Sequence, residues 1–236
     1  MAPNTPAHEQ RHVTVTPLAR AHGAGFSALG LVIFAVAIFL WLIDAPLPPA
    51  AFGLLYIASA ALLFLGSAKV FEPPISFEIT PEAIRYCHRR GHWQIFWDNI
   101  VRYDIPRVHR GLELDEVPYI GFALHDIEPL LADITPRLAV YLLSEQRHLL
   151  VVALRHERPD IQDYSPYFEV PDRFVAASGK IYKGVQAMFA TRCTHFRELL
   201  GYDLFVPVSA LDRPPEEFVA WLHALQNTKA LSDIGY

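Results

Sequence analysis

Five basic side chains gather around one predicted turn, and they are the residues best suited to bind a ligand. They are Arg85, His88, Arg89, Arg90 and His92. A basic residue close to an anionic membrane surface contributes about 1 kcal/mol of attraction. One hypothesis is therefore that this cluster binds anionic lipid head groups. The alternative is a basic turn that is exposed only to solvent.

Residue types that bind metals also occur near this turn. Cys87, His88 and His92 are close in sequence. Consecutive residues of a strand point to opposite faces, so Cys87 and His88 do not easily share one metal ion. The other histidines are scattered without ligand spacing. We expect neither a metal site nor a cofactor.

Sequence signatures of catalysis are missing. The chain has no Gly-x-Ser-x-Gly, no His-Glu-x-x-His and no phosphate-binding Gly-x-x-x-x-Gly-Lys-Ser/Thr motif. The stretch Ser178–Lys180 lacks the leading glycine of the last motif. We therefore expect a protein that is not an enzyme, and keep an enzyme with an unrecognised site as an alternative.

Three aromatic residues follow the basic turn. Trp93, Phe96 and Trp97 alternate across a predicted strand, so at least one of them is expected to face outward. Exposed aromatic side chains at the rim of a sheet are typical of a groove for a peptide or a protein. The leading hypothesis is that the chain binds a protein partner or scaffolds an assembly, with these three as the candidate partner-binding residues. Lipid sensing through the basic turn is the second hypothesis.

The elements that position these residues begin with two apolar runs. Phe26–Ile43 and Ala50–Ala68 contain no charged residue, and each is near the roughly 20 apolar residues that a helix needs to cross a bilayer. The break between them, Asp44–Pro49, holds three prolines, which cannot continue a helix. We predict a transmembrane hairpin with helices at 26–43 and 50–70. The first run is longer than a signal-peptide core, which favours an uncleaved anchor.

Charge sets the expected orientation. The hairpin loop carries no Lys or Arg, whereas the flanks carry Arg11, Arg20 and Lys69. Because Lys and Arg accumulate on the cytoplasmic side, we expect a two-span protein of the inner membrane with both termini in the cytoplasm. Residues 1–25 are polar and are expected to form a flexible cytoplasmic segment. Residues 71–236 are expected to form a cytoplasmic domain.

The composition of this domain narrows the choice of partners. Residues 71–236 hold 17 Lys and Arg against 23 Asp and Glu, a net charge of −6 with histidines neutral. A general nucleic-acid binder usually shows a basic face, so we expect no nucleic-acid partner. With only Cys87 and Cys193, the chain has no disulfide framework. The expected partners are the lipid bilayer, its anionic head groups and a protein.

Short alternating apolar runs predict antiparallel strands after Pro74. The expected strands are 76–80, 83–88, 92–97, 99–105 and 119–124, with Val101, Tyr103 and Ile105 aligned on one face. Helices are expected at 135–147, at 183–200 and from 212 onward. Leu149–Arg155 is expected to form a strand. Thr135 is expected to cap the first of these helices, ahead of Pro136.

The stretch 77–86, the Arg-Arg-Gly turn and Trp93–Trp97 with Asp98, Asn99 and Ile100 resemble the opening of bacterial pleckstrin-homology-like (PH-like) domains. More narrowly, the chain is similar to an uncharacterised family of two-span bacterial membrane proteins along Tyr103–Val108, Pro118–Gly121, Thr135–Leu143 with Glu145-Gln146-Arg147, and Arg197–Pro207. The resemblance implies an α+β fold, in which an antiparallel PH-like β-barrel or sandwich follows the hairpin and ends in a C-terminal helix. The helical stretch at about 128–200 departs from that pattern and is interpreted as an insertion. The resemblance supplies no catalytic residues.

Overall fold

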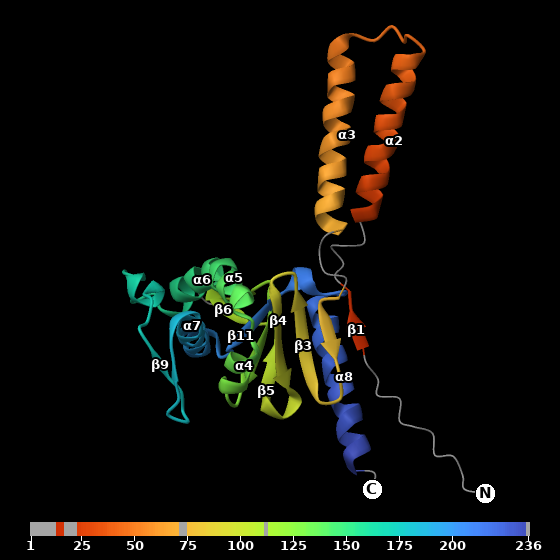
Figure 1. Cartoon of the computed structure of the whole chain (residues 1–236). Coiled ribbons are helices and arrows are strands. Elements are labelled where there is room, and N and C mark those ends of the chain that lie inside the picture. The colour runs from red at the N-terminus through yellow and green to blue at the C-terminus, as the bar shows by residue number, and fades with distance from the viewer. Residues whose placement is uncertain (1–12, 17–22, 71–74, 111–112, 235–236) are drawn as a thin grey trace, which may run out of the picture.

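A pair of long helices stands out from a body of helices and antiparallel sheets (Figure 1). The structure is a computed structural model that describes residues 13–16, 23–70, 75–110 and 113–234. The helices of the pair are α2 (Gly23–Leu42) and α3 (Pro49–Val70). The body therefore has the mixed α and β character that the sequence predicts.

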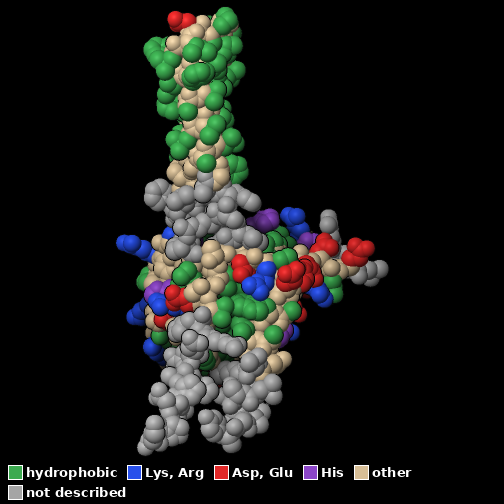
Figure 2. All heavy atoms as spheres, turned by 90° about the vertical axis from the view of Figure 1, so that its right-hand side faces the viewer, with side chains coloured by type: hydrophobic (Ala, Val, Ile, Leu, Met, Phe, Trp, Pro, Cys, Tyr) green, Lys and Arg blue, Asp and Glu red, His purple; other side chains and the backbone are tan. Residues whose placement is uncertain are grey.

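Both helices of the pair are long and apolar enough to cross a membrane. The windows Gly25–Leu42 and Pro49–Ser67 have mean hydropathies of 2.4 and 1.9, and 11% of each window is buried inside the structure. A core helix of a soluble protein is mostly buried. Figure 2 shows hydrophobic side chains along the visible face of the pair instead. Such apolar, uncovered surface suits contact with lipid.

Small residues lie in the contact between α2 and α3, together with the rings of Phe34 and Tyr56, whose centres are 6.0 Å apart. Gly30, Ala37, Ser59 and Gly66 are buried between the helices. A Cβ at Gly30 would lie 3.0 Å from the backbone nitrogen of Leu63. Glycine at this position therefore permits the close approach of the two backbones.

The first sheet joins a strand from before the helical pair to three strands from after it. Its order is β1 (Val13–Val15), β2 (Phe77–Ile79), β3 (Ala83–His88) and β4 (Gly91–Phe96), with all neighbours antiparallel. Val15 lies opposite Phe77 and is fully buried. The expectation that residues 1–25 form a flexible segment is therefore wrong at 13–15, because Val15 belongs to the core. Residues 1–12 and 17–22 of that segment lie outside the described residues.

The second sheet has the order β11 (Leu204–Pro207), β8 (Tyr119–Leu124) and β5 (Ile100–Asp104). Two small hairpins complete the strands, β6 (Arg107–Arg110) with β7 (Glu113–Glu116) and β9 (Phe174–Val175) with β10 (Ile181–Tyr182). After β4 the chain turns through the short helix η1 (Trp97–Asn99), and β5 pairs with β8 rather than with β4. The sheets in the described part of the chain are therefore open, and the closed form of the expected barrel is wrong.

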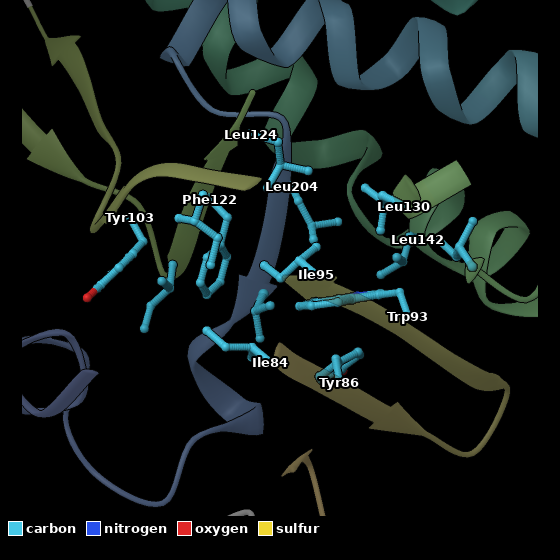
Figure 3. Packing of buried hydrophobic residues seen from close by; sticks show 14 of the residues in the cluster. Ile84, Tyr86, Trp93, Ile95, Tyr103, Phe122, Leu124, Leu130, Leu142 and Leu204 are labelled. Atoms are coloured by element: carbon cyan, nitrogen blue, oxygen red, sulfur yellow. The ribbon is translucent and has the colours of Figure 1, made fainter. Parts of the chain in front are cut away.

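The two larger sheets share one hydrophobic core. Figure 3 shows Ile84, Trp93 and Ile95 of the first sheet pointing toward Phe122 and Leu204 of the second. The C-terminal helix α8 (Pro215–Ile234) adds to this core, since the rings of Phe218 and Phe77 lie 5.5 Å apart.

Most of the remaining helices come between β8 and β11 in the sequence, and these two strands pair with each other in the second sheet. They are α4 (Glu128–Asp133), α5 (Pro136–Glu145), α6 (Arg147–Glu157), η2 (Ser165–Phe168) and α7 (Gly184–Leu200), and η3 (Val208–Ala210) follows β11. The prediction of a strand at Leu149–Arg155 is wrong, because this stretch lies in α6. Its buried residues are Leu149, Leu150, Ala153 and Leu154, which have the spacing of one helix face.

Two local expectations also fail, each for a clear reason. Val101 is 51% exposed rather than aligned with Tyr103, because the register shifts between Ile100 and Arg102. Thr135 precedes α5 as predicted, but its hydroxyl donates to the carbonyl oxygen of Arg90 (3.3 Å) and does not cap the helix.

Candidate functional site

The turn between β3 and β4 lies at the end of the first sheet that is attached to the helical pair. Val15, Phe77, Tyr86 and Trp93 stand opposite one another across the four strands. The chain leaves β1 toward α2 just after Val15, and it enters β2 from α3 just before Phe77. Strand β3 continues past Tyr86 toward the turn. The turn is therefore on the side of the sheet from which α2 and α3 extend (Figure 1).

The turn presents two arginines and is held against α5. Arg89 and Arg90 are exposed, and neither forms an ion pair with a carboxylate among the described residues. The backbone N–H of Thr135 donates to the carbonyl oxygen of His92 (3.1 Å). Gly91 has a φ of +134°, and a Cβ there would overlap the Thr135 side chain. The position of the two arginines is thus fixed by tight packing.

Helix α5 adds a third arginine beside the turn. A shallow hollow of about 470 Å³ is lined by Arg90, Pro136, Arg137 and Val140, and Val140 is 49% exposed. The guanidinium carbon of Arg90 lies 4.6 Å from the centre of the Tyr141 ring, a cation–π contact. We call Arg89, Arg90 and Arg137 the basic edge. It combines positive charge with a small apolar floor.

His88 lies beneath the basic edge and is held between two tyrosines. Its ring stacks on Tyr141 at 4.6 Å and on Tyr86 at 6.2 Å. Burial lowers the pKa of His88, and the positive charges of Arg89 and Arg90 lower it further. The imidazole therefore favours its neutral form and adds little positive charge at neutral pH.

Arg85 and His92 are not part of this edge. Both lie on the face of the first sheet opposite Tyr86 and Trp93. Arg85 is 3.8 Å from a carboxylate oxygen of Glu78, and His92 is 4.0 Å from one of Asp133. The predicted five-residue cluster thus divides between the two faces.

Sequence reasoning missed the residues that α5 contributes. Arg137, Val140 and Tyr141 have the spacing i, i+3 and i+4, which places them on one face of a helix. That spacing was a usable signal for a shared surface. Their contact with the β3–β4 turn had no signal in the sequence.

The residues that suggested a metal do not converge. Cys87 and His92 oppose each other on the outer face of the sheet, whereas His88 points to the other face. The described residues hold no group of three or more His, Cys, Asp or Glu side chains placed to bind a metal ion.

The three aromatic candidates for partner binding differ in how far their side chains are exposed to solvent. Trp93 is fully buried and Trp97 is 6% exposed, whereas Phe96 is 47% exposed. The expectation that at least one of them faces outward holds for Phe96. Trp93 and Trp97 offer no surface to a partner because they pack in the core, which corrects their proposed role.

The body and the two membrane-length helices define a class of protein with a mixed α and β domain beside an apolar helical pair. A family model described as "Protein of unknown function (DUF2982)" matches residues 77–228, and the chain belongs to this family. The match begins at the first residue of β2 and ends within α8, so β1, α2 and α3 lie outside it. Searches of curated proteins and of solved structures gave no match.

Proposed function

We propose that the chain is a two-span inner-membrane protein whose cytoplasmic domain rests its basic edge on anionic lipid head groups beside its own anchor. It acts as a binding module and not as an enzyme. The observation that carries this proposal is the register of the first sheet. It places Arg89 and Arg90 at the sheet end to which both membrane-length helices are attached.

The pairing of β1 with β2 supports a hairpin that crosses the membrane twice. The two strands flank α2 and α3 in the chain, and the N–H of Ser76 donates to the carbonyl oxygen of Val15 (2.8 Å). Both flanks must therefore lie on the same side of a membrane. The arginines lie on the body side, and the loop between the helices has no Lys or Arg. The positive-inside rule then favours a cytoplasmic body.

The charge of the basic edge is sufficient to orient a tethered domain. Three arginines near an anionic surface contribute about 3 kcal/mol in total at about 1 kcal/mol each. The anchor already holds the domain at the membrane, so the local concentration of head groups is high and a modest attraction is enough. The exposed Val140 and Pro136 between the arginines suit the apolar part of the interface.

A PH-like domain is the form of the body that we propose. Two antiparallel sheets share one core, and the C-terminal helix α8 packs on it through Phe218 and Leu222. Residues 128–200 form the helical insertion in this interpretation. The resemblance of the stretch 77–100 to the opening of such domains supports the same assignment.

Hydrogen exchange of the full-length protein in nanodiscs tests the lipid contact. Amides of residues 86–92 and 135–143 should exchange more slowly in discs that contain phosphatidylglycerol than in discs of phosphatidylcholine alone. The triple variant Arg89→Gln, Arg90→Gln and Arg137→Gln should lose this difference. Added salt should reduce it, because salt screens exposed charges.

A charge-matched control separates the basic edge from net charge. Arg155→Gln with Arg158→Gln and Arg173→Gln removes three exposed arginines elsewhere on the body. This triple variant should keep the slower amide exchange in discs that contain phosphatidylglycerol. Equal exchange in both lipids for the natural protein, or equal loss in the control, would contradict the proposal.

A protein partner is the second candidate function, and the exposed Phe96 favours it. Phe96 pairs with Ala83 at the other end of β3 and β4, away from the basic edge. A photo-crosslinking amino acid in place of Phe96 should capture a defined protein in intact membranes. The same substitution at the exposed Val175 is the control. Identical products at both positions would reject this candidate.

A further inference from the structure

A cleft on the body shares Val140 with the hollow at the basic edge but has other arginines, and its composition is that of a site for an organic anion. It has a volume of about 390 Å³ and opens between α5, the start of α6, η2 and α7. Small-ligand sites commonly measure about 300–1,000 Å³. Val140, Leu143 and Met188 supply its apolar wall, and Arg147 and Arg192 supply its positive charge. Arg90 and Arg137 do not line it.

The two arginines of the cleft converge on one aromatic ring. The guanidinium carbons of Arg147 and Arg192 lie 5.0 Å and 5.6 Å from the centre of Phe168. Neither forms an ion pair within 4.0 Å of a carboxylate among the described residues. Among the described residues, Arg192 donates one long hydrogen bond of 3.4 Å, to the carbonyl oxygen of Leu143. Two like charges thus share a cleft without a counter-ion.

The electrostatic setting of Arg192 agrees with this geometry. Burial lowers the pKa of Arg192, and the positive charge of Arg147 lowers it further. An anion bound to the two guanidinium groups would offset the repulsion between them and would accept strong, charge-assisted hydrogen bonds.

Other polar side chains line the cleft or the hollow that adjoins it. Glu169 lines the same cleft, and Glu198 lines the adjoining hollow together with His195. The Nδ1 atom of His195 is buried and has no hydrogen-bond partner in the part of the chain that the structure describes. The carboxylate of Glu169 is exposed and stands beyond ion-pair distance from both arginines, so it leaves their charge uncompensated.

We propose that this cleft binds a small organic anion, with a phosphate or carboxylate group between Arg147 and Arg192 and a short apolar group against Val140, Leu143 and Met188. The site does not depend on the lipid contact of the basic edge. Ligands of both kinds share one chemistry, which is an oxyanion attached to an apolar group.

Calorimetric titration of the full-length protein in an uncharged detergent tests the site. Phenyl phosphate and benzoate distinguish the two oxyanions, and we expect saturable binding of at least one of them. Benzyl alcohol lacks the charge and inorganic phosphate lacks the apolar group, so each should bind at least about tenfold more weakly.

Three variants decide whether the cleft is the site. Arg147→Gln should weaken binding of the preferred probe by about tenfold or more, because a charged hydrogen bond is lost. Arg155→Gln on the same helix is the matched control and should leave the affinity within about twofold. Glu169→Gln should tighten binding, because it removes a negative charge that lines the cleft and repels an anion.

The proposal is overturned if neither anion binds saturably or if benzyl alcohol binds as tightly as the anion that binds better. It is also overturned if Arg155→Gln weakens binding as much as Arg147→Gln. Because Arg147, Arg155 and Glu169 are exposed, we expect all three variants to fold.

Discussion

Replacing Val15 by alanine tests the joint between the helical pair and the body. Val15 is fully buried in the core although it precedes α2 in the chain. The substitution removes two methyl groups, worth about 1.6 kcal/mol at about 0.8 kcal/mol each. The cavity left behind raises the expected loss of unfolding free energy to about 2–3 kcal/mol.

Urea unfolding of the full-length protein in uncharged detergent measures this loss. Tryptophan fluorescence reports on the body through the buried Trp93 and Trp97, and Trp41→Phe in every variant removes the signal of α2. With a slope of about 2 kcal/mol per M, the midpoint for Val15→Ala should fall by about 1–1.5 M. Thr14→Ala, on the exposed face of the same strand, is the control and should change stability by less than about 1 kcal/mol.

One result of the urea experiment would contradict the placement of β1 in the core. If Val15→Ala and Thr14→Ala shift the midpoint equally, β1 is not part of the core. The pairing of β1 with β2 would then no longer place both flanks of the helical pair on one side of a membrane.

Three further outcomes follow from the packing and charges of the body. Gly91→Ala should lower the unfolding free energy by more than about 2 kcal/mol, because positive φ and overlap both oppose a Cβ, whereas Gly179→Ala has open space and adds only backbone strain. Asp203→Ala should cost about 3 kcal/mol in urea unfolding, because its buried carboxylate accepts from Arg197 and from the Leu124 N–H, whereas Asp160→Ala at the surface should change little. His88 has a lowered pKa, so the folded state binds fewer protons than the unfolded state and stability falls as the pH drops below 6.5. His88→Gln should flatten that part of a stability profile measured by urea unfolding at several pH values.

Long or strictly alternating patterns allowed much of the fold to be predicted. The strands at 83–88 and 119–124 have the predicted bounds, and the two apolar runs became α2 and α3. The β-branched pair Val151 and Val152 favours a strand. The stretch forms helix α6 instead, because the buried leucines around this pair have the spacing of one helix face. Strand β1 could not be predicted, because three residues give no period and their partner lies beyond the helical pair.

The candidate site was predicted only in part. The basic residues of the turn were identified, and strand alternation explains why Arg85 faces away from His88. The contribution of Arg137 depends on the packing of α5 against Gly91, a tertiary contact that no local pattern encodes. No local pattern predicts the cleft either, because Arg147, Arg192 and Phe168 belong to three different elements and come together only in the folded chain.

Cysteine labelling with a membrane-impermeant maleimide tests the central claim most directly. Thr14→Cys, Leu47→Cys and Ser178→Cys place exposed thiols on β1, in the hairpin loop and on the body; Cys87→Ser removes the half-buried thiol, and Cys193 is buried. We predict that the thiol at 47 is labelled only in intact spheroplasts, and that those at 14 and 178 are labelled only in inverted vesicles. Labelling of positions 14 and 178 from opposite sides, or of all three from one side, would contradict a two-span hairpin with both flanks in the cytoplasm.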